Sequence, residues 1–166
     1  MDARYSTAVC IQSVAFRFSC ERVGAEFAEL DVAAGADAAV ELAGADIVCC
    51  ATSATAPLFD AAALREQVHV NAIGSFRPSM RELPDDLLAG ATVVVDDRAA
   101  ALAEAGEIIH AIDAGRLRAD DLLELGPLLA AADRPVPGRT VFKSVGVAVQ
   151  DWAVLDRLAQ HLAPSP

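Results

Sequence analysis

The chain has 166 residues, of which 54% are hydrophobic, enough to form the packed core of one compact domain. Aromatic residues make up only 5%, which favours helices packed on a sheet over an aromatic-rich β-sandwich. The net charge of −11 argues against a nucleic-acid or membrane-surface partner, because an acidic surface repels phosphate backbones and anionic lipid.

The N-terminal segment lacks the pattern of a secretory signal. Arg4 has the acidic Asp2 close by, and Gln12 and Ser13 interrupt the apolar stretch that follows. No run of the chain approaches the roughly 18 apolar residues of a membrane span. We therefore expect a cytoplasmic protein without a membrane partner.

Short β-rich runs alternate along the chain with alanine-, leucine- and glutamate-rich segments of helical spacing. The expected strands are Val14–Phe18, Ile47–Ala51, Val68–Ile73, Thr92–Val95 and Thr140–Phe142. The expected helices are Glu21–Leu30, Ala36–Leu42, Pro84–Leu88, Arg98 to about Ala114, and about Val147–Leu162. Asp97 is the expected N-cap of the long helix and Gly115 its stop. Continuous apolar strands between helices predict an α/β fold, a doubly wound parallel sheet with helices on both faces.

Ligands of such a sheet collect outside the carboxyl ends of its strands. The segments that follow four of the expected strands are Ala51-Thr52-Ser53, Gly74–Pro78, Asp96-Asp97 and Lys143–Gly146. Three of the four carry small hydroxyl or glycine residues that let a ligand approach the backbone. Their convergence predicts a binding edge.

Lys143 is the only lysine of the chain, and the other twelve basic residues are arginines. One interpretation is a point charge held near an anionic ligand or cofactor phosphate; the other is an ordinary strand-end lysine that reaches solvent. The backbone N–H groups of 144–146 open the last helix, which makes them a second candidate for anion or amide binding.

Several other side chains have an ordinary structural interpretation. Asp96-Asp97 could hold a metal, but capping of the following helix explains Asp97 without one. We expect Trp152 to be a packing residue of the last helix, and we interpret the three widely separated histidines as exposed or hydrogen-bonded. The four cysteines form no C-x-x-C motif, and the adjacent Cys49 and Cys50 point to opposite faces of a strand, so we interpret the cysteines as small buried thiols in a reducing cytoplasm.

A dinucleotide-binding domain begins with a strand, a G-x-G-x-x-G turn and a helix. No two of the ten glycines here are two residues apart, so this fingerprint is absent from the chain. The Walker A, G-x-S-x-G and H-E-x-x-H motifs are absent as well. If this is a dinucleotide-binding sheet, its phosphate loop and first strand are not in these 166 residues.

An ordered set of motifs nevertheless resembles the ornithine cyclodeaminase/mu-crystallin family, over roughly Val14 to Leu162. The matching segments are Ala45-Asp46-Ile47-Val48, Ala51-Thr52-Ser53, His69-Val70-Asn71-Ala72-Ile73-Gly74, Met80-Arg81-Glu82-Leu83, Val94-Val95-Asp96, Glu124-Leu125-Gly126 and Thr140-Val141-Phe142-Lys143-Ser144-Val145-Gly146. The resemblance implies a homodimeric, NAD(P)-dependent enzyme with a Rossmann domain and a separate domain for substrate and dimerisation. Members include cyclodeaminases, ketimine or pyrroline-2-carboxylate reductases and amino-acid dehydrogenases.

Roles follow from the resemblance residue by residue. Thr52 and the segment Asn71, Ala72, Ile73 and Gly74 would line the nicotinamide side of the cofactor. Ser144 would hydrogen-bond the cofactor, and Val145 would contact the substrate. Arg22, near the expected end of the second Rossmann strand, favours NADP(H) weakly over NAD(H). No metal is implied.

Two departures from the family pattern shape the expectation. The catalytic aspartate of cyclodeaminases falls at Phe76, and a phenyl ring cannot move protons. We therefore expect hydride transfer to an imine carbon, as in a ketimine reductase or amino-acid dehydrogenase, with an imine or amino acid as substrate. Ornithine cyclodeaminase proper, which converts ornithine to proline and ammonia, is the alternative.

The second departure is that the N-terminal substrate domain of the family has no counterpart here. The sequence resembles the C-terminal half of such an enzyme. Residues 1–139 are expected to form a partial Rossmann domain, and residues 140–166 the last strand and a helix that leads back to the substrate and dimerisation domain. A truncated, non-catalytic fragment that acts only by association is a further alternative, and in either case we expect a homodimer or other self-association.

Overall fold

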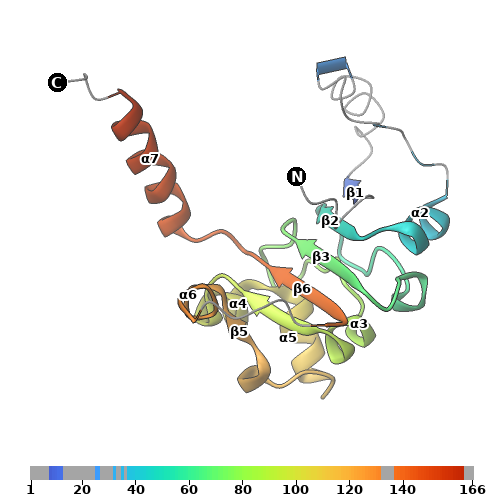
Figure 1. Ribbon diagram of the computed structural model, residues 1–166. Coiled ribbons are helices and arrows are strands. Elements are labelled where there is room, and N and C mark those ends of the chain that lie inside the picture. Colours follow the sequence, from blue (N-terminus) through green and yellow to red (C-terminus); the bar gives the residue numbers. More distant parts are fainter. Residues whose placement is uncertain are drawn as a thin grey trace.

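A computed structural model describes residues 8–12, 25–26, 32, 35, 37–131 and 137–162. Within these residues six strands form one parallel sheet in the order β1-β2-β3-β6-β4-β5 (Figure 1). The strands are β1 (Ala8–Gln12), β2 (Ile47–Ala51), β3 (Val68–Ala72), β4 (Thr92–Val95), β5 (Leu123–Glu124) and β6 (Arg139–Lys143). The predicted parallel α/β sheet is confirmed.

Four of the predicted strands match observed strands to within one residue at each end. The fifth, Val14–Phe18, lies outside the described residues, and β1 comes earlier in the chain. β5 was not predicted, because two residues carry no hydrophobic pattern. β6 lies between β3 and β4, so the segment after residue 139 contributes a central strand of the sheet; the division into two parts at that residue stays a prediction.

The helices also follow the expected order. They are α2 (Ala38–Gly44), α3 (Asp85–Gly90), α4 (Arg98–Glu104), α5 (Gly106–Asp113), α6 (Leu125–Ala130) and α7 (Ala148–Leu162), with short 3-10 turns η1 (Ala61–Ala63) and η2 (Ala119–Asp121). Of the predicted helix Glu21–Leu30, only Ala25 and Glu26 are described, and both are helical. α6 was not predicted. None of the helices within the described ranges combines the length and apolar character that a bilayer crossing requires.

The single long helix predicted from Arg98 to Ala114 is wrong, because the chain breaks between α4 and α5. Ala105 is extended, with φ −79° and ψ 98°. A Cβ added at Gly106 would overlap the carbonyl oxygens of Met80 and Pro78, so the start of α5 lies directly against the 77–80 loop. The predicted ends are confirmed: Asp97 caps α4 through the Ala100 N–H at 2.7 Å, and Gly115 follows α5 with φ +67°.

The core lies on one face of the sheet. Side chains along β2, β3, β4 and β6 alternate between buried and half-buried positions, as a pleated strand dictates. α3 packs against α5 and β6, and α4 packs against α5, so their buried residues Leu87, Leu88, Ala101 and Ile108 join this face. As predicted, Cys49 and Cys50 point to opposite faces of β2, Cys49 half-buried and Cys50 buried.

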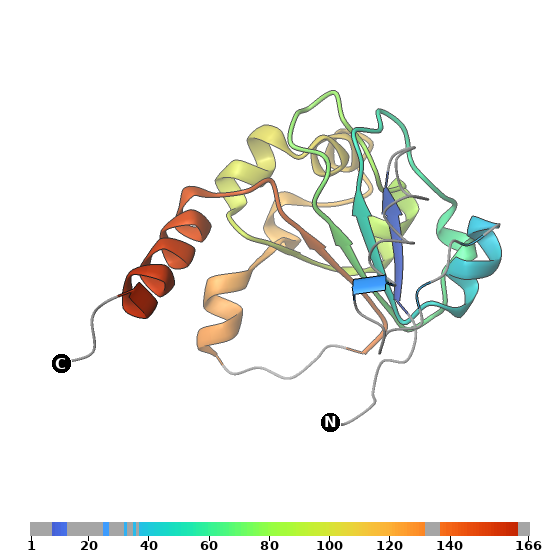
Figure 2. The ribbon, with the colours of Figure 1, turned by 90° about the horizontal axis from the view of Figure 1, so that it is seen from above.

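α7 extends away from the sheet, on the side opposite β1 in both views (Figures 1 and 2). None of its residues is buried, and its apolar side chains are 50–79% exposed. The prediction that Trp152 is a packing residue is therefore wrong within this chain, since Trp152 is 64% exposed. Helical spacing predicts an apolar stripe, but it does not say what covers that stripe.

Candidate functional site

Four loop segments meet at the carboxyl edge of the sheet, because β2, β3, β6 and β4 are consecutive neighbours and all run parallel. The segments are 52–58, 73–80, 144–147 and 96–97. The sequence singled out parts of all four as strand ends. The edge they form is the candidate site.

Glu82 ties two of these segments together. Its carboxylate is fully buried and accepts hydrogen bonds from three backbone N–H groups: Thr52 at 2.5 Å, Gly74 at 2.9 Å and Ser75 at 3.2 Å. The backbone of the same residue accepts from Leu58 N–H at 2.9 Å. The Glu82 carboxylate thus holds the loop after β2 and the loop after β3 together.

Gly74 makes this approach possible. A Cβ at that position would overlap the backbone N and O of Thr52 and lie 2.5 Å from a carboxylate oxygen of Glu82. Any side chain would therefore force the two loops apart. The glycine is required here by close backbone contact.

Lys143 differs from both sequence interpretations. It is fully buried, and its Nζ donates to the backbone oxygen of Ser75 at 2.5 Å and to the Ser75 hydroxyl at 2.7 Å. Glu107, also fully buried, lies 3.2 Å from Nζ and accepts a short hydrogen bond from the Ser75 hydroxyl. The lysine charge is therefore compensated inside the protein, where it faces neither solvent nor a ligand phosphate.

Ser144 begins the segment after β6 and faces the end of β4. Its hydroxyl donates to Asp96 Oδ2 at 2.7 Å and accepts from Gly146 N–H at 3.2 Å, while its own N–H bonds the Ala72 carbonyl at 3.2 Å. Asp96 also accepts from the Asp97 N–H. Asp96 thereby orients Ser144, while Asp97 caps α4 as predicted.

The other predicted site residues occupy the same edge at different depths. Thr52 is 9% exposed, and its hydroxyl accepts from Ala54 N–H at 3.2 Å. Ala72 is buried and offers backbone only, whereas Ile73 is 53% exposed and Val145 is half-buried. Phe76, the position at which the family resemblance implies the catalytic aspartate of cyclodeaminases, is 47% exposed and stacks with the Arg77 guanidinium, 5.2 Å from the ring centroid.

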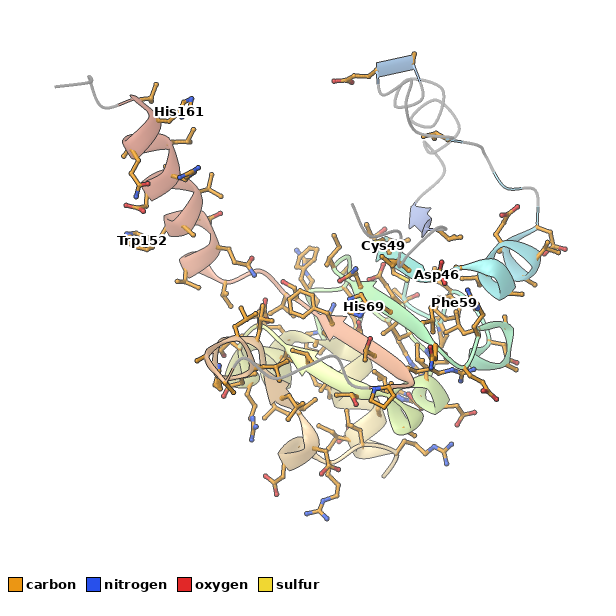
Figure 3. All side chains as sticks on the ribbon, viewed as in Figure 1. Asp46, Cys49, Phe59, His69, Trp152 and His161 are labelled. Carbon is orange, nitrogen blue, oxygen red and sulfur yellow. The ribbon has the colours of Figure 1, made fainter. Side chains whose placement is uncertain are left out.

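Asn71 lies one step below the edge, on the half-buried face of β3. Its polar neighbours on this face include His69 and Cys49, both labelled in Figure 3. Its Oδ1 is 3.2 Å from His69 Nε2, and its amide lies 3.7 Å from Cys49 Sγ. His69 Nδ1 in turn lies 2.7 Å from the Thr140 hydroxyl. The histidine is hydrogen-bonded, as expected, and the described residues include no group of three His, Cys, Asp or Glu side chains placed to hold a metal.

Sequence reasoning missed Glu82 and Glu107 as elements of the site, whereas it did single out Asp96 at the end of an expected strand. Glu82 and Glu107 resemble ordinary acids of helical or loop segments, and only their complete burial distinguishes them. A usable signal existed at one of them, because Glu82 falls inside the quoted block Met80–Leu83. Burial of a charge is a tertiary property that spacing does not reveal.

Known proteins share both the sequence pattern and the fold. The profile of the ornithine cyclodeaminase/mu-crystallin family matches residues 10–163. A Δ1-pyrroline-2-carboxylate reductase of Bacillus cereus is 44% identical over 125 residues, covering 70% of this chain and 37% of the relative. The ketimine reductase mu-crystallin of Mus musculus is 39% identical over 110 residues, covering 65% of this chain and 33% of the relative.

Among solved structures, the Δ1-pyrroline-2-carboxylate reductase of Thermococcus litoralis in complex with NADH and L-proline superposes with a TM-score of 0.80. It is 25% identical, and the match covers 92% of this chain and 49% of that structure. The chain therefore spans between a third and a half of the length of these proteins.

Proposed function

Because the chain belongs to the ornithine cyclodeaminase/mu-crystallin family, we propose that it is an NAD(P)-dependent oxidoreductase that transfers a hydride to an imine carbon. The nearest activity is that of a ketimine or pyrroline-2-carboxylate reductase, with an amino-acid dehydrogenase closely related in chemistry. The observation that carries the proposal is the meeting of the family's motif segments at one edge of the sheet, around Ser144, Ile73 and Gly74.

The described residues fit the nicotinamide end of such a cofactor. The edge offers an exposed apolar side chain at Ile73 and a half-buried glycine at Gly74. The Ser144 hydroxyl donates a hydrogen bond to Asp96, and one lone pair of its oxygen accepts a hydrogen bond from the Gly146 N–H. The other lone pair remains to accept from an amide N–H2 such as that of nicotinamide. These are uncharged contacts, suited to a ring and a carboxamide.

A bound nicotinamide cofactor supplies the hydride, so the role of the chain's residues is to bind the cofactor and the substrate and to orient them toward each other. In this proposal Ser144 holds the carboxamide, the 73–75 backbone supports the ring, and Val145 contacts the substrate. Phe76 offers an exposed aromatic ring on the 73–80 loop beside the edge.

Phe76 also separates the proposal from a cyclodeaminase proper. Ornithine cyclisation requires proton transfer and an oriented water, and a phenyl ring supplies neither. The substrate class we propose is accordingly an imine derived from an α-keto acid, with Δ1-pyrroline-2-carboxylate as the first compound to test. Formation of proline from ornithine with a catalytic amount of NAD would favour the cyclodeaminase instead.

The first test is a fluorescence titration of the chain with NADPH and with NADH. Saturable binding supports the proposal, and the expectation from Arg22, which lies outside the described residues, is that NADPH binds more tightly. Absence of binding at millimolar cofactor contradicts a cofactor site in this chain. Where binding is found, loss of NAD(P)H absorbance on addition of Δ1-pyrroline-2-carboxylate tests the reaction.

Substitution of Ser144 tests the site itself. Ser144→Leu fills the space beside Asp96 with an apolar side chain and removes the hydroxyl, so we expect cofactor affinity to fall at least about tenfold. Ser79→Leu is the matched control, because Ser79 is exposed on the 73–80 loop. Unchanged affinity in a folded Ser144→Leu variant would refute the role of Ser144.

We also propose that the chain self-associates, as a homodimer or otherwise. The support is the exposed apolar surface of α7, where Trp152, Leu155, Leu158 and Leu162 recur every three or four residues. The same observation favours the second candidate, a chain that acts only by association. Association without any cofactor binding would select that candidate.

A further inference from the structure

The backbone N–H groups that follow β2 and β3 would ordinarily be available to a ligand. N–H groups at the carboxyl ends of parallel strands form the concavities that bind phosphate in many α/β proteins. Here the three such groups of Thr52, Gly74 and Ser75 all donate to Glu82. The protein therefore supplies its own anion to these three N–H groups.

Among the residues that the structure describes, no cation forms an ion pair with the Glu82 carboxylate. Glu82 is fully buried, and its hydrogen-bond partners are neutral backbone groups. The neighbouring buried pair, Lys143 and Glu107, is neutral as a unit and meets the same loop at Ser75. The group formed by Glu82, Glu107 and Lys143 therefore carries one net negative charge, with little water to screen it.

We infer that Glu82 makes this edge selective for a group that is uncharged or positive, and that it favours the oxidised over the reduced nicotinamide ring. The inference rests on the proposed function, since it places the nicotinamide end of the cofactor at this edge. The ring of NAD+ carries a positive charge and that of NADH does not, while both carry the same phosphates. A buried negative charge at this edge would attract the positively charged oxidised ring and leave the neutral reduced ring without that attraction.

The test compares the affinities of NAD+ and NADH in the wild-type chain and in Glu82→Gln by calorimetry. Glutamine keeps the size of the side chain and removes its charge. We expect NAD+ affinity to fall about three- to tenfold more than NADH affinity, the change expected from loss of one buried charge near the ring. A purely structural role would weaken both forms equally, and that result, or an unchanged ratio, would overturn the inference.

Glu104→Gln is the matched control. Glu104 is exposed at the end of α4, and its substitution changes the net charge of the protein by the same amount as Glu82→Gln. The NAD+ to NADH ratio should stay at the wild-type value in this variant. An equal change in both variants would assign the effect to overall charge and overturn the inference.

A second measurement needs no variant and stands if Glu82→Gln fails to fold. Amide hydrogen exchange and chemical shifts of Thr52, Gly74 and Ser75 are followed by NMR in the wild-type chain. We expect the three amides to be protected without ligand, shifted by NAD+, and unmoved by ADP-ribose, which has both phosphates and lacks nicotinamide. Equal shifts with ADP-ribose would overturn the inference, whereas no binding of any nicotinamide cofactor would overturn the proposed function and the inference with it.

Discussion

At the residue scale, the candidate site depends on side chains that proteins rarely bury. Glu82, Glu107 and Lys143 are all fully buried, and each has polar partners from the loop at 74–75. Removing one partner from such a group leaves a charge or a donor without compensation, which costs more than the contact itself contributed. The conformation of the loop after β3 is therefore strongly determined by its surroundings.

Gly74 offers a test of this tight packing. We expect Gly74→Ala to lower the free energy of unfolding by about 1–3 kcal/mol, because the added methyl overlaps the Thr52 backbone. Gly90→Ala is the control, since nothing lies within 4 Å of the added Cβ at the end of α3. That variant should be neutral or more stable by about 0.4–1 kcal/mol. Equal denaturant midpoints for the two variants would show that the loops tolerate separation.

At the scale of elements, the break between α4 and α5 brings the start of α5 onto the site. Because the chain is extended at Ala105, Gly106 approaches the 77–80 carbonyls and Glu107 reaches Ser75 from the first turn of α5. A continuous helix would not place both residues there. The short helix α4 that precedes the break then depends on its own cap for a defined start.

We expect α4 to be destabilised when its N-cap residue is replaced. Asp97→Ala removes the acceptor of the Ala100 N–H, and we expect a loss of about 1 kcal/mol in unfolding free energy. Asp113→Ala is the matched control, because Asp113 is an exposed acid in the last turn of α5, where its removal is neutral or slightly favourable. Thermal unfolding of both variants checks the difference, and a cap that contributes nothing would give them the same midpoint.

At the scale of the whole molecule, an exposed apolar helix accompanies a well-packed sheet. α7 has no buried residue, whereas one face of β2, β3, β4 and β6 is buried under helices. Figure 3 shows Trp152 and His161 on α7, away from the side chains of the sheet. Monomeric proteins seldom expose such a surface, which is why we propose self-association.

Self-association through α7 has a direct test in sedimentation velocity over a range of concentrations. We expect concentration-dependent association of the wild-type chain, and at least about tenfold weaker association in Leu155→Glu, because one leucine contributes about 1.5–3 kcal/mol when buried. Gln160→Glu is the control, since it adds the same charge at an exposed polar position of α7. A monodisperse monomer at all concentrations would contradict the proposal.

Much of the fold could be predicted from the local sequence pattern. Ile47–Ala51 and Thr92–Val95 have the continuous apolar character of strands in a covered parallel sheet, and Asp97 and Gly115 are effective helix boundaries in any context. The two-residue strand β5 and the break at Ala105 could not be predicted in this way. Neither leaves a periodic signal, and the break results from contact with a loop distant in the sequence.

The candidate site was likewise predictable from the sequence in part only. Which strand ends carry small and polar residues is a property of the sequence, and the parallel alternation of strands and helices already directed attention to Thr52, Gly74 and Ser144. Only the tertiary structure decided which groups lie next to these residues. The strand order placed β6 between β3 and β4. Lys143, a candidate ligand contact in the sequence, is a buried ion paired with Glu107. The physical reason is the sequence separation over which each kind of interaction acts. Propensity, capping and periodicity act within a few residues, whereas compensation of a buried charge joins residues up to 68 positions apart, such as Ser75 and Lys143.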